Sequence, residues 1–332
     1  MKSTRFTLMA STALLAFSTF TSSAQAQVPR TFVSVQGKDS NSCDNHEKAC
    51  RSINAAIAKV QAAGEVVIVD SGTFQPFTAN KSVTVVAAPG AHAGISVSSG
   101  IGAAVSAGAT DTVILRGLTL NAVGGSDGIV FMSGAALHVE NCVVNGFSSN
   151  GIAVGPGGNF FARNVTVRNN AGGGILLSPF GTGPLTASLE NVNVDGNGTG
   201  INIQSNALQN PVRVTIRDSV VAGNKFLGIV AGTPPGSGAT AEVIIDNCKM
   251  TGNLSGPVAG LGTTMSVSNS VITHNGSGIN TFPGAVAYVS NTTITHNATG
   301  LLINGGSLLS RGNNTVESNT IDGSFNGTII AK

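Results

Sequence analysis

A spaced pattern of polar residues repeats along the C-terminal half of the chain and constrains the fold more than any other feature. Position zero of each unit is Asn or Asp, found at Asn164, Asn191, Asp218, Asn247, Asn269, Asn291 and Asn313. Six residues later each unit has a second asparagine, found at Asn170, Asn197, Asn224, Asn253, Asn275, Asn297 and Asn319. A glycine stands nine or ten residues after position zero, at Gly174, Gly200, Gly228, Gly256, Gly278, Gly300 and Gly323. Units spaced by 22 to 29 residues indicate a solenoid.

Short stretches of alternating apolar and polar residues lie between these markers, as in ASLEN, VNVDG and GINIQ. Alternation is the period of β-strands, and three strands with three turns account for a unit of 22 residues. Such units cannot bury their apolar faces alone, so we expect parallel sheets around a continuous core. One inward aliphatic stack is predicted three residues after position zero, at Val144, Val167, Val194, Val221, Met250, Ile272, Ile294 and Val316. The position-zero amides are predicted to bond from coil to coil as an asparagine ladder.

These units resemble the right-handed parallel β-helix repeats of the pectin-lyase-like superfamily over roughly residues 31–325. The stretch FVSVQGKDSNSCDNHEKACRSINAAIAKVQAAGEVVIVDSGTF also resembles the N-terminal segment of exported members, in which a short helix plugs the open end of the coil. Independently, Ile53, Ala56, Ile57 and Val60 lie on one helical face. The resemblance implies an all-β fold, a single-stranded right-handed parallel β-helix of about 9 to 11 coils with three short parallel sheets and an N-terminal capping helix.

The N-terminus has the pattern of a secretory signal peptide. Lys2 and Arg5 precede a short apolar run, and Ala24-Gln25-Ala26 is typical of a cleavage site, so we expect cleavage after Ala26. The predicted organisation is a signal peptide over 1–26, an N-terminal segment with the capping helix over 27–80, the β-helix over 81–325 and a tail over 326–332. No later segment is apolar enough to span a membrane, so the mature protein is expected to be secreted or periplasmic.

The net charge and the positions of the cysteines indicate which partners and which bonds to expect. Cleavage after Ala26 removes two of the 17 basic residues and none of the 15 acidic ones, which leaves a neutral chain. A neutral chain lacks the basic face that nucleic acids require, so nucleic acid is not an expected partner. Cys43 and Cys50 lie close together in a polar loop of an exported chain, where a disulfide is expected. Cys142 and Cys248 are interpreted as small core residues.

The signs of the charges alternate along one predicted outward row. The residue before position zero is Arg116, Glu140, Arg163, Glu190, Arg217 and Asp246 in successive coils, with Gly117 and Asn141 as the two earlier zeros. Arg168 is expected to face Asp195, and Arg213 to face Glu242. Opposite charges on neighbouring strands attract by about 0.2 to 1 kcal/mol. We therefore interpret these charges as structural partners that also fix the register.

The strand after each repeat glycine is the one that carries catalytic Asp, Lys or Arg in lyases and hydrolases of this superfamily. Its predicted outward residues here are Ala153, Leu176, Asn202, Val230, Val258, Asn280 and Leu302. This row has no carboxylate pair for glycoside hydrolysis, no Asp cluster for Ca²⁺ and no basic residue to take a proton. The Asn-Thr-Asp, paired-Asp and Gly-His-Gly signatures of polygalacturonases do not occur either. We expect no metal and no cofactor.

The sequence THN occurs twice, with His274 and His296 both five residues after position zero. Their side chains should stack across one strand spacing. Two imidazoles could share a metal ion, but Gly252 and Ser318 hold the same place in the adjacent coils and supply no good third ligand. Duplicated architecture is the preferred interpretation.

Three longer coils suggest where a binding site lies. Their extra residues are SPFGTGP (178–184), SNALQNP (205–211) and GTPPGSG (232–238), all entering just after the glycine strand. They should form one wall beside its outer face, and insertions gathered on one face of a solenoid often mark the binding side. The predicted substrate-binding residues are Leu176, Asn202, Gln204, Val230 and Asn280. The competing interpretation is that this corner merely tolerates insertions.

Two main functional hypotheses follow. The first is an exported, monomeric β-helix that binds a polysaccharide or a cell-surface glycan without turning it over. The second is a polysaccharide lyase, hydrolase or epimerase whose acid and base come from less regular positions, such as Asp127, Asp111, Glu317 or Arg168. The passenger domain of an autotransporter is a third hypothesis.

Overall fold

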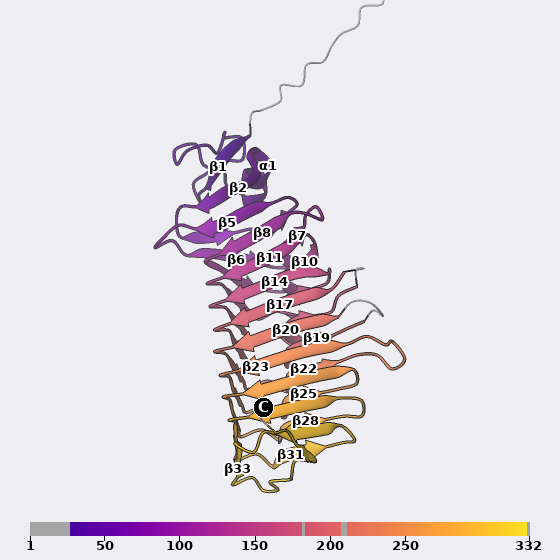
Figure 1. Cartoon of the computed structure of the whole chain (residues 1–332). Helices are drawn as coiled ribbons and strands as arrows, with labels where there is room; N and C mark the ends of the chain where they lie inside the picture. Colours follow the sequence, from indigo (N-terminus) through magenta and orange to yellow (C-terminus); the bar gives the residue numbers. More distant parts are fainter. Residues whose placement is uncertain (1–26, 181–182, 207–210, 331–332) are drawn as a thin grey trace, which may run out of the picture.

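The chain winds into an elongated solenoid, seen along its length in the computed structural model (Figure 1). The structure describes residues 27–180, 183–206 and 211–330. Each turn contributes one strand to each of three parallel sheets, which have 13, 11 and 10 strands and are called sheets A, B and C. The predicted all-β right-handed parallel β-helix with three sheets is confirmed.

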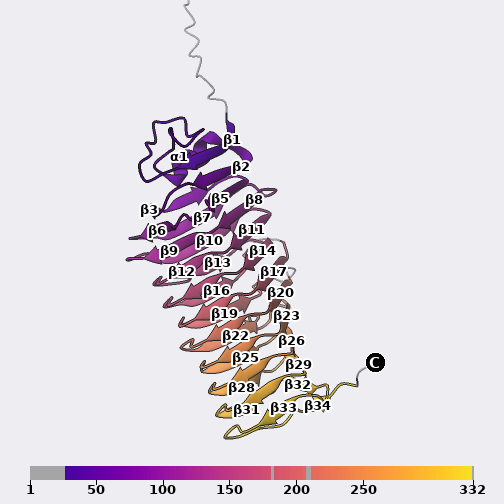
Figure 2. The same ribbon diagram turned by 90° about the vertical axis from the view of Figure 1, so that its left-hand side faces the viewer.

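The strand bounds show how regular the winding is. Sheet A contains β1 (Val28–Val33), β2 (Val60–Ile68), β5 (Val83–Ala87), β8 (Thr112–Arg116), β11 (Ala136–Glu140), β14 (Gly158–Arg163), β17 (Leu185–Glu190), β20 (Val212–Arg217), β23 (Ala241–Asp246), β26 (Thr263–Ser268), β29 (Val286–Ser290), β32 (Ser307–Ser310) and β34 (Gly327–Thr328). Sheet B contains β3 (Gly72–Phe74), β6 (Ala93–Val97), β9 (Leu118–Ala122), β12 (Val143–Asn145), β15 (Thr166–Arg168), β18 (Asn193–Asp195), β21 (Val220–Ala222), β24 (Lys249–Thr251), β27 (Val271–Thr273), β30 (Thr293–Thr295) and β33 (Thr315–Glu317). Sheet C contains β4 (Phe77–Ala79), β7 (Ile101–Ser106), β10 (Asp127–Ser133), β13 (Ile152–Val154), β16 (Gly173–Leu177), β19 (Thr199–Gln204), β22 (Leu227–Gly232), β25 (Ser255–Ala259), β28 (Ser277–Thr281) and β31 (Thr299–Ile303). Figure 2 shows the sheet C strands from β13 to β31 following one another along the solenoid.

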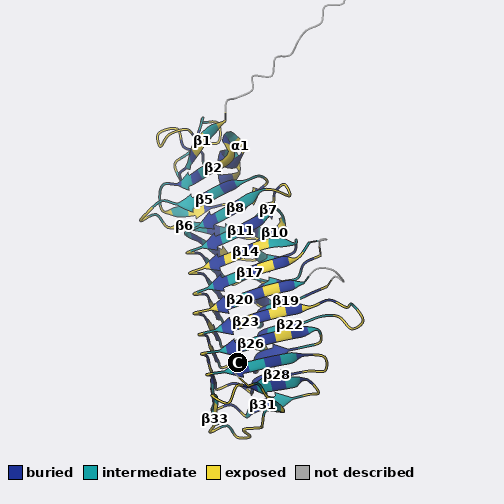
Figure 3. Cartoon of the chain, in the orientation of Figure 1, coloured by how far each residue is buried: buried dark blue, intermediate teal, exposed yellow. Residues whose placement is uncertain are grey.

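The core lies inside the coil because alternate residues of each strand point inward. Val167, Val194 and Val221 of the predicted aliphatic stack are fully buried and pair directly from strand to strand. Figure 3 shows the resulting alternation of buried and more exposed residues along the strands. Cys142 and Cys248 are buried, and burial raises the pKa of each thiol to about 11, so both stay protonated and unreactive.

A short helix, α1 (Ile53–Lys59), caps the N-terminal end of the coil (Figure 1). The Ser52 side chain accepts a hydrogen bond from the Ala55 N–H as its N-cap, and Ile53, Ala56 and Ile57 are buried. Cys43 and Cys50 form a disulfide bond in the loop before the helix. Strands β2 to β4 already belong to the sheets, and β34 pairs with β32, so the solenoid extends beyond the predicted range of 81–325 at both ends. Residues 1–26, the predicted signal peptide, lie outside the described residues.

The position-zero asparagines make the sharp turn from sheet A to sheet B. Asn164 (φ 55°) and Asn191 (φ 50°) have left-handed backbone conformations, which Asn tolerates better than most residues. Their amides form the predicted ladder, since Asn191 Nδ2 donates to Asn164 Oδ1 at 2.8 Å and Asn164 Nδ2 to Asn141 Oδ1 at 3.0 Å. This ladder is exposed to solvent.

A second asparagine ladder is buried inside the coil, six residues after position zero. Asn197, Asn224 and Asn253 are 1%, 1% and 4% exposed. Asn197 N and Nδ2 both donate to Asn224 Oδ1, at 3.0 and 3.1 Å, and Asn224 N and Nδ2 donate to Asn253 Oδ1 at 3.0 and 2.9 Å. Each side-chain oxygen therefore accepts hydrogen bonds from both the backbone N–H and the side-chain amide of the equivalent asparagine in the preceding coil. These asparagines recur in the sequence, but a ladder was predicted only for position zero.

The predicted charge row is in register, but only some of its members form ion pairs. Two pairs of the row form, Arg116 with Glu140 at 2.9 Å and Arg217 with Glu190 at 3.1 Å. The separately predicted pair of Arg213 with Glu242 also forms, at 3.4 Å. Asp246 stands opposite Arg217 in the strand register. Its Oδ1 instead accepts hydrogen bonds from Ser268 Oγ (2.6 Å) and Asn269 Nδ2 (2.7 Å). These bonds lower the pKa of Asp246.

Arg168 and Asp195 face each other on neighbouring coils as expected, but their side chains do not form an ion pair. The two residues are partners in the strand register. The Asp195 carboxylate, however, lies against Gly223 of the following coil, on the side away from Arg168. Within the described ranges no ion pair joins them.

Candidate functional site

The outer face of sheet C carries the row predicted from the repeat glycines. Strand pairing aligns Ala153, Leu176, Asn202, Val230, Val258, Asn280 and Leu302 in successive coils. Each alternates with a core residue, so Ile201 and Ile203 point inward on either side of Asn202. Each strand of the row begins near a repeat glycine, and at Gly200 no larger residue fits. A Cβ on Gly200 would lie 2.3 Å from the Gly228 carbonyl oxygen of the next coil.

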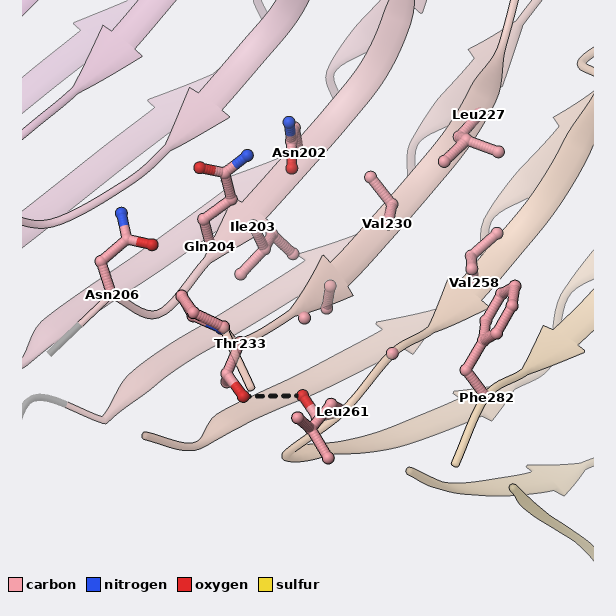
Figure 4. Close-up of a pocket in the computed structure, with 14 residues that line it drawn as sticks. Asn202, Ile203, Gln204, Asn206, Leu227, Val230, Thr233, Val258, Leu261 and Phe282 are labelled. Atoms are coloured by element: carbon pink, nitrogen blue, oxygen red, sulfur yellow. Dashed lines mark hydrogen bonds between the residues drawn. The ribbon is translucent and has the colours of Figure 1, made fainter. Parts of the chain in front are cut away.

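A groove of about 510 Å³ opens on this face across four coils (Figure 4). Asn202 and Gln204 of β19 lie on one side of it, and Val230 of β22 forms part of its floor. Phe282, which follows β28, lies beside Val258 at the far side and is 40% exposed. The volume falls within the about 300 to 1,000 Å³ usual for small-molecule sites.

The turns after sheet C form a wall along the groove. Thr233 Oγ1 donates to the Leu261 carbonyl oxygen at 3.0 Å, which ties the turn after β22 to the turn after β25 (Figure 4). Ser178 Oγ donates to Gln204 Oε1 at 3.3 Å, and Asn206 Nδ2 donates to Ser178 Oγ at 2.7 Å. The first two insertions therefore contact each other. The Ser205 backbone N–H donates to the Gly232 carbonyl oxygen at 3.2 Å, which joins the second insertion to the third. Residues 181–182 and 207–210 of these insertions lie outside the described residues.

The structure brings together three of the five predicted binding residues. Asn202, Gln204 and Val230 line the groove. Leu176 lies on β16, one strand before Asn202, and does not line the groove. Asn280 is only 8% exposed, and its Oδ1 accepts a hydrogen bond from Asn304 Nδ2 at 3.0 Å.

The sequence predicted only part of the apolar surface of the groove. Phe282, Leu261 and Leu227 line it, although none belongs to the outward row of alternate residues. The available signal was the place of Phe282 in the turn sequence TFPG, directly after the stretch that carries Asn280 of the predicted row.

The groove is uncharged. None of the described residues that line it is acidic, basic or histidine. The structure does not gather the residues of the alternative catalytic hypothesis at one place. Arg168 and Glu317 lie on β15 and β33 of sheet B, six strands apart, which is about 29 Å.

The two remaining acids of that hypothesis have structural partners. Asp127 Oδ1 accepts from the Asn150 backbone N–H at 3.1 Å. Asp111 Oδ1 accepts from Ser82 Oγ at 2.6 Å, and this bond together with the Gly108 N–H lowers the pKa of Asp111. Neither carboxyl lines the groove.

The paired histidines stack as expected, with ring centroids 5.3 Å apart and planes 8° from parallel. His274 and His296 both have φ of 56°, and in other coils the same place holds Gly196, Gly223 and Gly252, which also have positive φ. This position therefore selects residues that tolerate a left-handed backbone. Among the described residues, no three His, Cys, Asp or Glu side chains gather to hold a metal ion.

Three stacked parallel sheets, asparagine ladders and an N-terminal capping helix define a right-handed parallel β-helix. A family model described as the right handed beta helix region matches residues 93–234 and 174–332. The chain belongs to this right-handed β-helix family. Comparison with curated proteins finds no significant sequence match. No helix in the described part of the chain is long and apolar enough to cross a membrane.

Solved structures share the fold at low identity. Pectate lyase Pel9A is 17% identical with a TM-score of 0.57, and the match covers 92% of this chain and 80% of that one. The A-module of the mannuronan C-5 epimerase AlgE4 of Azotobacter vinelandii is 15% identical with a TM-score of 0.59, covering 81% and 91%. XylC in complex with xylose is 8% identical with a TM-score of 0.58, covering 82% and 69%. At these identities the likeness concerns the fold.

Proposed function

We propose that the protein is an exported β-helix that binds an uncharged or weakly charged polysaccharide in the groove on sheet C. The observation that carries this proposal is the composition of the groove. Amide side chains of Asn202, Gln204 and Asn206 offer donors and acceptors, while Val230 and Phe282 offer apolar contact. Sugar rings present hydroxyl groups at their edges and C–H groups on their faces, so they need both kinds of surface.

The shape of the groove supports a chain as the ligand. It crosses the four coils of β19, β22, β25 and β28, a span of three strand spacings or about 14 Å. The exposed ring of Phe282 gives one end an aromatic surface. The loop wall closes one long side, which favours a ligand running along the solenoid.

The groove supports binding better than turnover. Proton transfer in glycoside hydrolysis, elimination or epimerisation needs an acid or base within about 3 Å of the reacting group. The described lining residues are amides, one hydroxyl, glycines and apolar side chains. Lyase, hydrolase or epimerase activity is therefore the alternative that the test below must distinguish.

The test is a panel of neutral and acidic polysaccharides titrated into the mature protein, with parallel assays for new reducing ends, new unsaturated ends and C-5 inversion. We expect binding of a neutral or weakly acidic chain with no product. Phe282→Ala should weaken binding, whereas Phe226→Ala should not, because Phe226 is similarly exposed but does not line the groove. Product formation would favour the enzymatic alternative.

The loop wall provides a second test. Shortening 178–184 and 232–238 to the spacing of the 22-residue coils should abolish binding while the coil stays folded, because the later coils lack these insertions. Binding that survives both deletions would move the site elsewhere. Export is tested separately, by measuring whether the mature protein begins at Gln27.

A further inference from the structure

A second pocket, of about 260 Å³, opens on the outer face of sheet A, away from the groove on sheet C. Strands β11, β14 and β17 form it. The side chains that line it include His138, Glu140, Phe161, Arg163, Ser188 and Glu190. Unlike the groove on sheet C, this pocket therefore has charged side chains. Nothing in the proposed function uses this pocket.

Two stacked rings, those of His138 and Phe161, form one side of this pocket. His138, Phe161 and Ser188 are direct neighbours on successive strands. The rings of His138 and Phe161 are stacked, with centroids 4.5 Å apart and planes at 21°. Burial lowers the pKa of His138, which favours the uncharged imidazole in this stack. Ser188 is too small to continue the stack, so the next strand spacing of about 4.8 Å leaves room for one six-membered ring against Phe161.

The charge row leaves one arginine unpaired beside this space. Glu140 Oε2 is paired with Arg116 at 2.9 Å, and Glu190 Oε2 is paired with Arg217 at 3.1 Å. Both glutamates thus turn to their outer neighbours, although Arg163 lies between them in the register. No described residue forms an ion pair or hydrogen bond with the Arg163 side chain. The three arginines and two glutamates leave a net charge of +1, with Arg163 at the centre.

We propose that this pocket binds a six-membered ring that carries one carboxylate. The ring would lie on Ser188 against Phe161, and the carboxylate would accept a bidentate pair of hydrogen bonds from Arg163. The flanking glutamates favour a single negative charge, because a dianion would be repelled by both. A neutral ring would leave the guanidinium without a partner, and a carboxylate without a ring would leave the face of Phe161 in water.

Two classes of ligand combine a six-membered ring with one carboxylate, and they differ in the shape of the ring. An aromatic acid supplies a planar ring, whereas a sugar acid supplies a puckered ring with hydroxyl groups. The test is a titration of the mature protein with benzoate and with glucuronate, followed by NMR or calorimetry. Benzyl alcohol and glucose are the matched neutral ligands. We expect benzoate, glucuronate or both to bind, binding that weakens with salt, and neither neutral ligand to bind comparably.

Variants locate the site. Arg163→Gln should weaken binding at least about tenfold, because a charge-assisted bidentate contact is lost. The control Arg168→Gln removes another exposed arginine, on sheet B, and should have no effect. Ser188→Leu should fill the space and abolish binding, whereas Ser188→Ala should preserve it.

Three results would overturn the proposal: no binding of either acid, equal binding of the neutral ligands, or equal losses in Arg163→Gln and Arg168→Gln. Phe282→Ala affects only the groove, so its effect on polysaccharide binding separates a failure of this proposal from a failure of the proposed function.

Discussion

Replacing Asn224 with alanine should destabilise the solenoid by about 2 to 6 kcal/mol. Asn224 is 1% exposed, and its Oδ1 accepts from both the backbone N–H and the side-chain amide of Asn197, at 3.0 and 3.1 Å. Alanine removes this acceptor and leaves two buried donors without it. Each unsatisfied buried group costs about 1 to 3 kcal/mol, which gives the expected range.

The matched control is Asn191→Gly in the exposed ladder. Asn191 also donates its amide to the preceding coil, to Asn164 Oδ1 at 2.8 Å. Glycine adopts its φ of 50° without strain, and water replaces the lost bond, so we expect a cost of at most about 1 kcal/mol. The assay is urea unfolding followed by far-UV circular dichroism, comparing midpoints at equal slopes. Equal losses in the two variants would refute the claim that the inner ladder holds the coils together.

Three further predictions concern charged and titratable residues. Asp246→Arg should lower the melting temperature more than Asp246→Asn, because it sets a second arginine opposite Arg217; equal melting temperatures would contradict this. Hydrogen bonds hold the pKa of Asp246 below its ordinary value of 3.8, so its carboxylate adds stability above that pH and loses it as the pH falls through the lowered pKa. The stability gap between wild type and Asp246→Asn should therefore close in acid, and a constant gap would argue against the assignment. His274→Gly combined with His296→Gly should leave polysaccharide binding unchanged, whereas lost binding, or zinc that copurifies with wild type alone, would show a role beyond the fold.

The fold could be predicted from the sequence because the same turn residues recur in each coil. Asn164 and Asn191 recur because a left-handed backbone at the corner between sheets A and B excludes most residue types. Once these corners are fixed, alternation assigns every strand residue to the core or to the surface, as at Asn202 and Val230. The register of the charge row followed in the same way.

Side-chain environments were harder to predict because they depend on neighbouring coils. Alternation places Asn280 on the outside, yet the structure leaves it 8% exposed. Phe282 lines the groove from a turn, where no periodic rule applies. The alternating signs did not predict which of its two neighbouring arginines each glutamate would pair with. The structure was needed to show that Glu140 and Glu190 both pair with other arginines and leave Arg163 without an ion pair.

Gly232 allows a direct test of whether the uncharged groove on sheet C holds a polysaccharide chain. This residue lines the groove at the end of β22, and a Cβ there would come no closer than 3.8 Å to its nearest neighbour, the Gly260 Cα. Gly232→Phe should therefore fill the groove without straining the backbone, while Gly232→Ala leaves it open.

The measurement is the affinity of the wild-type protein, Gly232→Phe and Gly232→Ala for the best ligand of the panel, at low and at physiological salt. We predict binding by wild type and Gly232→Ala that hardly changes with salt, because no lining charge is available for ions to screen, and no binding by Gly232→Phe. Undiminished binding by Gly232→Phe, or wild-type binding that collapses at physiological salt, would contradict the claim.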